Sequence, residues 1–273
     1  MNRRDFLLAL AAGTAVVAGC SDGGMPLPKA RPTPDAARPV TRTDAVAPSP
    51  RAGAVHPHRP ARPAVVHRPP PEVLTELPGN SRRIALTVDD GVSSYVVGTL
   101  IDFVKASGIR VTMFPNGVYS SWTDHAKKLR PLVERGQVQL GNHTWSHPDL
   151  TSLSDKQIAY QIRRNEQFLH RTFGVDPAPY LRPPYGFHNK RTDQVAADLG
   201  YRLITMWYGV LGDGTSYYSP DQLVANARQW FDPGRIVIGH ANQDPITHVY
   251  GQLLDLLRAR RLQTVTLADV FGH

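Results

Sequence analysis

Two histidines four residues apart, His143 and His147, follow the apolar run 138–140. Neutral imidazoles presented together at the end of a strand are suitable ligands for a transition metal. Pro148 argues against a long helix through the pair, so we expect a turn here rather than the zinc-binding helix of metalloproteases. A metal centre with catalytic function needs a third protein ligand and a position left open for chemistry.

A pair of carboxylates, Asp89 and Asp90, could supply that ligand. They precede Gly91, and an Asp-Gly sequence by itself is typical of a turn. Two neighbouring carboxylates at a strand end repel each other, however, and a cation would relieve the repulsion. One of them could bind the metal while the other takes a proton from a water molecule beside it. The spacing does not decide which does which, and two histidines with one carboxylate fit zinc as well as the iron(II) of oxygenases.

Arg182, Tyr185 and His240 could complete a hydrolytic site. Two prolines between Arg182 and Tyr185 restrict the backbone, so the Tyr185 amide N–H can be aimed at a developing negative charge. Arg182 could pair with Asp89 and keep it ionised. His240 could protonate a leaving amine, because its pKa suits neutral pH. The structural alternatives are a rigid turn with Arg182 on the surface and a buried His240 bonded to backbone.

Each of these clusters follows an apolar run that we expect to be a strand, and strands alternate with helices from residue 81 to residue 273. The expected strands are 84–88, 109–114, 138–142, 180–182, 202–207, 236–239 and 263–267. The expected helices are 96–106, 125–135, 154–172, 191–199, 220–230 and 246–260. This alternation predicts an α/β domain with a mainly parallel sheet covered by helices. Polar clusters at the ends of several strands favour a barrel over an open doubly wound sheet.

The first twenty residues read as an export signal. Arg3 and Arg4 precede the apolar run 7–18, which is too short to span a bilayer, and the pair resembles a twin-arginine signal. Residues 17–20 resemble a bacterial lipobox, in which Cys20 is lipidated after cleavage; an ordinary buried thiol is the alternative. Cys20 is the only cysteine, which excludes an internal disulfide and a thiolate metal site. We therefore expect a lipoprotein anchored to the cell membrane on its extracytoplasmic face.

Residues 21–80 contain fourteen of the 24 prolines. Such a composition buries too little apolar surface to fold, so we expect a disordered and extended linker between the anchor and a domain over residues 81–273. The net charge of +8 and the pI near 9.8 favour anionic surfaces such as lipid headgroups or acidic wall polymers. We expect no nucleic-acid partner for an exported protein.

The motifs around these residues resemble the polysaccharide deacetylases of carbohydrate esterase family 4, which carry the NodB homology domain. The resemblance rests on residues 87–91 (TVDDG), 143–147 (HTWSH), 182–185 (RPPY) and 238–240 (IGH). It implies a distorted (β/α)7-8 barrel and a divalent metal held by Asp90, His143 and His147. Zinc is the expected metal, with cobalt, nickel or manganese as alternatives. The roles implied for the remaining residues are Asp89 as general base, Arg182 as its tether, the Tyr185 N–H as oxyanion donor, His240 as general acid, and Pro184, Tyr185 and Trp207 as substrate-binding residues.

One motif departs from the family pattern. The family usually places an Asp-Trp pair after the sixth strand, where the Asp tunes the acid histidine. Here the strand ends at Trp207, which could face the sugar or belong to the core, and the nearest acid is Asp213 before Gly214. The resulting expectation is a monomeric, metal-dependent enzyme that removes N-acetyl groups from a polysaccharide and releases acetate, with peptidoglycan favoured by location. The alternatives are a catalytically weak glycan-binding lipoprotein that keeps the metal pocket, an O-acetyl-xylan esterase and an iron(II) oxygenase.

Overall fold

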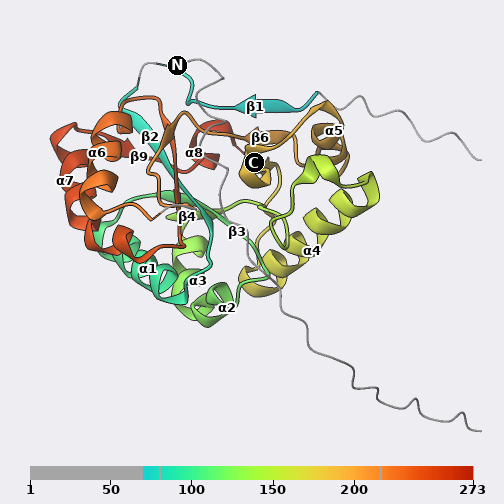
Figure 1. The fold of residues 1–273 in the computed structure, drawn as a ribbon, viewed down its shortest axis with the longest axis horizontal. Helices are drawn as coiled ribbons and strands as arrows, with labels where there is room; N and C mark the ends of the chain where they lie inside the picture. Colours follow the sequence, from blue (N-terminus) through green and yellow to red (C-terminus); the bar gives the residue numbers. More distant parts are fainter. Residues whose placement is uncertain (1–69, 80, 215–216, 273) are drawn as a thin grey trace, which may run out of the picture. The chain divides into compact units, whose positions relative to one another are not determined.

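The computed structural model describes residues 70–79, 81–214 and 217–272 (Figure 1). The predicted signal over residues 1–20, including Cys20, and the predicted linker up to residue 69 lie outside the described part of the chain. Within the part described, none of the helices combines the length and apolar character needed to cross a membrane.

Two parallel sheets form the centre of the fold. The larger sheet has the order β4-β3-β2-β8-β7, and β9 also pairs with β2. Its strands are β2 (Arg83–Asp90), β3 (Val111–Pro115), β4 (Val138–Leu140), β7 (Gly209–Val210), β8 (Ile236–His240) and β9 (Gln263–Thr264). The smaller sheet has the order β1-β6-β5, with β1 (Glu72–Leu74), β5 (Tyr180–Leu181) and β6 (Leu203–Thr205). A parallel bridge between Asn142 and Leu181 joins the two sheets next to β4 and β5. The arrangement is a distorted α/β barrel, which confirms the predicted fold class.

Eight α-helices of the described residues connect and cover the strands: α1 (Ser94–Ser107), α2 (Ser121–Asp124), α3 (Ala126–Glu134), α4 (Asp155–Phe173), α5 (Lys190–Asp198), α6 (Pro220–Trp230), α7 (Tyr250–Ala259) and α8 (Ala268–Phe271). Three 3₁₀ turns lie between them: η1 (Leu150–Ser152), η2 (Pro184–Gly186) and η3 (Asp244–His248). Ser154 precedes α4 as its N-cap and forms a capping box with Gln157.

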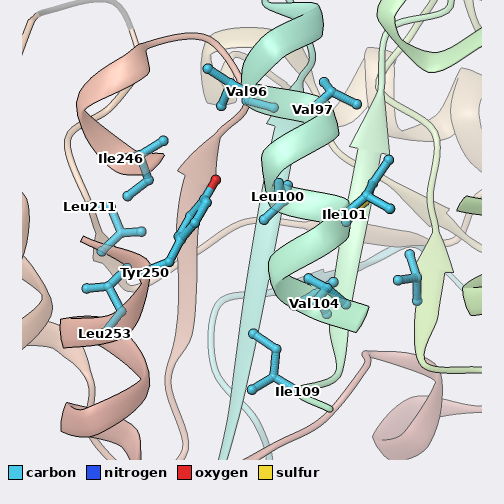
Figure 2. Close-up of a cluster of buried hydrophobic side chains, with 14 of the residues drawn as sticks. Val96, Val97, Leu100, Ile101, Val104, Ile109, Leu211, Ile246, Tyr250 and Leu253 are labelled. Carbon is cyan, nitrogen blue, oxygen red and sulfur yellow. The ribbon is translucent and has the colours of Figure 1, made fainter. Parts of the chain in front are cut away.

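The alternation of side chains along β2 separates the core from the site. Leu86 and Val88 pack against the main hydrophobic cluster under the helices, whereas Thr87 and Asp89 point to the opposite face and contact Arg182. Figure 2 shows this cluster, in which Leu100 of α1 faces the side chains of α7. The strand thus anchors its acidic end by burying the apolar residues before it.

The structure differs from the prediction in three places. β1 lies inside the segment predicted as linker and pairs with β6, so the domain begins before residue 81. A strand of three residues is too short to show the alternation of apolar and polar side chains, and β1 is stabilised by its pairing with β6. The helix predicted over 246–260 is divided into η3 and α7 at Val249. The short elements α2, β7 and α8 were not predicted.

Candidate metal centre and active site

The two carboxylates at the end of β2 lie on the same side of the sheet. In a regular strand, neighbouring side chains point to opposite faces. Asp90 instead has a left-handed backbone with φ of 68°. His143 Nε2 accordingly lies 3.6 Å from Asp89 Oδ2 and 3.3 Å from Asp90 Oδ1. The Trp122 indole holds this turn by donating from Nε1 to the Asp90 carbonyl oxygen at 2.7 Å.

Gly91 is required beside that turn. Its φ is 101°, and a Cβ added there would lie 2.2 Å from Trp122 Nε1. The glycine therefore lets the indole approach the backbone closely enough to bond Asp90.

Three predicted ligands converge at one point. One ligand atom each from Asp90, His143 and His147 lies within 4.8 Å of the others. Asp90 Oδ1 lies 3.3 Å from His143 Nε2 and 3.4 Å from His147 Nε2. Asp90 Oδ1 is buried and has no hydrogen-bond partner among the described residues, and such an oxygen needs a partner. Two imidazoles and a carboxylate are a donor set for zinc and related divalent ions, so the residues fit a divalent metal.

The two imidazoles differ in their hydrogen bonding and in the direction of their pKa shifts. His143 Nδ1 donates to the Arg182 carbonyl oxygen at 2.7 Å, which leaves the lone pair of the neutral ring on Nε2. Burial lowers the pKa of His143, but the charges of Asp89 and Asp90 outweigh burial and raise the pKa above its ordinary value. Burial and the nearby His143 lower the pKa of His147 to about 4, so this ring is neutral at neutral pH.

The loop that carries the histidines is a turn, as predicted, and not a helix. Thr144 and His147 both have left-handed backbones, with φ of 68° and 59°. Asn116 fixes the loop from β3 by donating from Nδ2 to the carbonyl oxygens of His143 and Thr144 at 2.6 and 3.0 Å. Asn116 could not be predicted from the sequence, because nothing in its type or spacing distinguishes it from an ordinary loop residue.

Arg182 is fully buried beside Asp89. Its Nη1 lies 2.8 Å from Asp89 Oδ1 and donates to Thr87 Oγ1 at 2.7 Å. Its Nε and Nη2 donate to the carbonyl oxygens of Thr205 and Met206 at 3.0 and 3.2 Å. The guanidinium therefore holds one oxygen of Asp89, while Oδ2 remains directed toward His143. The alternative of a surface arginine is wrong.

The segment after Arg182 places the other predicted residues. Tyr185 has a left-handed φ of 58°, and its ring packs edge-on against His147 with centroids 4.4 Å apart. Pro184 is buried, so little of it can contact a ligand. Trp207 is partly buried and packs against a hydrophobic cluster, with the backbone of Gly186 against its ring. This position favours the core alternative for Trp207.

His240 ends β8 directly beside Asp89, its partner in the β2–β8 ladder. Asp213 contacts it twice: Asp213 Oδ1 lies 3.1 Å from His240 Nδ1, and Asp213 Oδ2 accepts from the His240 backbone N–H at 3.0 Å. Burial lowers the pKa of His240, but the hydrogen bond and charge of Asp213, with smaller contributions from Asp89 and Asp90, raise the pKa to about 9. The sequence identified Asp213 as the nearest acid without assigning it to His240, and the structure provides that contact.

Two further features surround the His240–Asp213 pair. A mostly apolar cavity between the sheet and helices α1 and α7 reaches both side chains, which limits solvent screening of the pair. Gly214 covers the His240 ring: a Cβ added there would lie 3.0 Å from Cε1. The residue after Asp213 therefore lies against His240.

Comparisons with known proteins agree with this geometry. The polysaccharide deacetylase family model matches residues 76–204. A peptidoglycan-N-acetylglucosamine deacetylase of Listeria monocytogenes is 29% identical over 193 residues, which cover 71% of this chain and 40% of that protein. A chitin deacetylase of Pestalotiopsis sp is 30% identical over 195 residues, which cover 69% of this chain and 63% of that protein. This chain thus spans less than half the length of the Listeria relative.

A solved structure has the same fold. The family 4 carbohydrate esterase from Streptomyces lividans, determined in complex with acetate, is 26% identical and superimposes with a TM-score of 0.59 over 68% of this chain and 93% of its own. With its Asp-His-His cluster, the chain belongs to the polysaccharide deacetylases of carbohydrate esterase family 4.

Proposed function

We propose that this chain hydrolyses the acetamido groups of a glycan and releases acetate. The observation that carries the proposal is the convergence of Asp90, His143 and His147 within 4.8 Å, with Asp89 and His240 paired next to each other at the ends of β2 and β8. A divalent metal held by the three ligands, zinc above all, would act as a Lewis acid toward the acetyl carbonyl and the attacking water.

The pairing of Asp89 with Arg182 and of Asp213 with His240 supports the following assignment of the two proton transfers. Asp89 accepts a proton from the attacking water through Oδ2, because Oδ1 is held by Arg182 Nη1 at 2.8 Å. The Tyr185 amide N–H stabilises the oxyanion. His240 donates its proton to the nitrogen as the carbon–nitrogen bond breaks, which leaves a free amine and acetate. A pKa of about 9 keeps His240 protonated at neutral pH, as a general acid requires.

Peptidoglycan is the proposed substrate. The Listeria relative is named for peptidoglycan N-acetylglucosamine and the Pestalotiopsis relative for chitin, and both polymers carry acetamido groups. The proposed location separates them: an exported chain anchored through Cys20, with residues up to 69 as a spacer, would meet the cell wall first. A Cys20→Ala variant that still partitions with membranes would refute the anchor. We propose that the domain acts as a monomer, which light scattering can test.

The experiment measures acetate release by the metal-reconstituted protein from peptidoglycan, chitin oligomers and acetyl-xylan in parallel. Asp89→Asn serves as the control, because it preserves side-chain size and removes the proton acceptor. Release from the first two substrates, absent in the control, is the expected result. Release from acetyl-xylan alone would make the protein an O-acetyl esterase. No release above the control from any substrate would refute the proposed hydrolysis and favour the glycan-binding alternative.

A further inference from the structure

Asn242 touches the proposed metal ligand Asp90 from the loop after β8. Its Nδ2 donates to Asp90 Oδ2 at 2.7 Å, and its Oδ1 accepts from the Val92 backbone N–H at 3.1 Å. Both polar ends of this side chain are therefore engaged with the segment that follows β2. Neither contact can be inferred from the sequence, since 152 residues separate Asn242 from Asp90.

The contact makes the two oxygens of Asp90 unequal. Oδ2 is bonded to Asn242, whereas Oδ1 is buried without a hydrogen-bond partner and faces the Nε2 atoms of His143 and His147 at 3.3 and 3.4 Å. An amide that donates to one carboxylate oxygen fixes the rotation of the whole group. It also weakens that oxygen as a ligand, because one of its lone pairs is already used.

The backbone of Asp90 is fixed independently of Asn242. Its carbonyl oxygen accepts from Trp122 Nε1 at 2.7 Å and from the Asn116 backbone N–H at 3.1 Å. What these bonds leave free is rotation of the carboxylate about its side-chain bonds. Asn242 is the described side chain that donates a hydrogen bond to that carboxylate.

We propose that Asn242 is a positioning residue that presents Asp90 Oδ1 as a single-oxygen ligand to the metal. The proposal rests on the metal site of the proposed function and adds a residue that acts through Asp90. Groups that hydrogen-bond a metal ligand typically change metal affinity by 10- to 100-fold when they are removed. We expect a loss in that range for Asn242, without unfolding of the domain.

The test titrates the chelator-treated protein with Zn²⁺ by calorimetry, and with Co²⁺ by its visible absorption, which reports coordination geometry. Asn242→Ala removes both hydrogen bonds, and Asn242→Leu removes them while keeping the same branched arrangement of four heavy atoms. Asn226→Ala is the matched control, because Asn226 Nδ2 also donates at 2.7 Å but to the Leu211 carbonyl oxygen. Circular dichroism and thermal unfolding of the metal-free proteins measure folding separately.

The expected result is a Kd for Zn²⁺ about 10- to 100-fold higher in both Asn242 variants, an altered Co²⁺ spectrum, and wild-type affinity in Asn226→Ala. Excess metal should restore much of the acetate release, which a general loss of structure would not allow. Wild-type metal affinity in either folded Asn242 variant overturns the proposal while leaving the proposed function intact. Failure of the wild-type protein itself to bind metal overturns both.

Discussion

The hydrogen bond between Asp213 and His240 is the feature whose removal should change catalysis most specifically. Asp213→Asn preserves the side-chain size but removes the negative charge from a residue that is 2% exposed. The neutral amide can offer a single oxygen, whereas the carboxylate now meets both the ring Nδ1 and the backbone N–H of His240. The protonated ring loses its nearest anionic partner.

The size of the effect follows from the pKa of His240. That pKa is raised from 6.5 to about 9, and a difference of about 2.5 units corresponds to ~3 kcal/mol in favour of the protonated ring. Because burial opposes protonation, removing the Asp213 charge should return the pKa to about 6.5 or below. At pH 8 the protonated fraction would then fall from most of the molecules to about 3%, which predicts a loss of roughly 30-fold in kcat/KM.

The assay is the pH dependence of kcat/KM for acetate release from the best of the three substrates. Asp213→Asn should move the basic limb down by about 2.5 pH units while leaving the affinity for Zn²⁺ unchanged. Asp193→Asn is the control, because Asp193 pairs with another histidine, His188, at 3.0 Å. An unchanged basic limb in Asp213→Asn would show that His240 is not the acid or that Asp213 does not set its pKa.

Three further predictions concern the same site. Asp89→Asn should retain metal in calorimetry but release no acetate, and urea titration should show a stability loss of about 3 kcal/mol, because the buried Arg182 loses its anionic partner. Gly214→Ala should lower kcat at unchanged metal affinity, because its Cβ would lie 3.0 Å from the His240 ring; a wild-type kcat would contradict this reading. The raised pKa of His240 should stabilise the metal-free protein by up to ~3 kcal/mol below pH 6.5, an increment lost as the pH rises through about 9. His240→Gln should lack this part of the pH dependence in urea titrations at pH 6 and pH 9.5.

Part of the site could be predicted because its chemistry is local. Asp90, His143 and His147 end or follow apolar runs, and parallel strands bring their carboxyl ends to one edge of a barrel whatever the details of packing. The donor types then select a divalent metal. The burial of Arg182 beside Asp89 also agrees with the prediction, since a pair of this kind is the way a protein keeps a guanidinium in its interior.

Other parts depended on contacts between distant segments. Trp207 follows a strand, as a groove residue would, but its partly buried side chain packs against a hydrophobic cluster. The strand β1 forms because it pairs with a free edge of β6, and a three-residue sequence is too short to predict that pairing. Burial and strand pairing of this kind depend on residues that are distant in the sequence. The secondary-structure propensity and hydrophobic periodicity of a segment therefore do not predict them.

By itself, the sequence determined the candidate donor residues of the metal site, the pair of carboxylates at the end of a strand, and the alternation of strands and helices that gathers them. Only the tertiary structure decided which acid supports His240 and which side chain holds Asp90. The Asp213–His240 and Asn242–Asp90 contacts each join a loop residue to the end of a strand, 27 and 152 residues away. Hydrogen bonds of 3.1 and 2.7 Å depend on how these segments pack, and a spacing along the chain does not specify that packing.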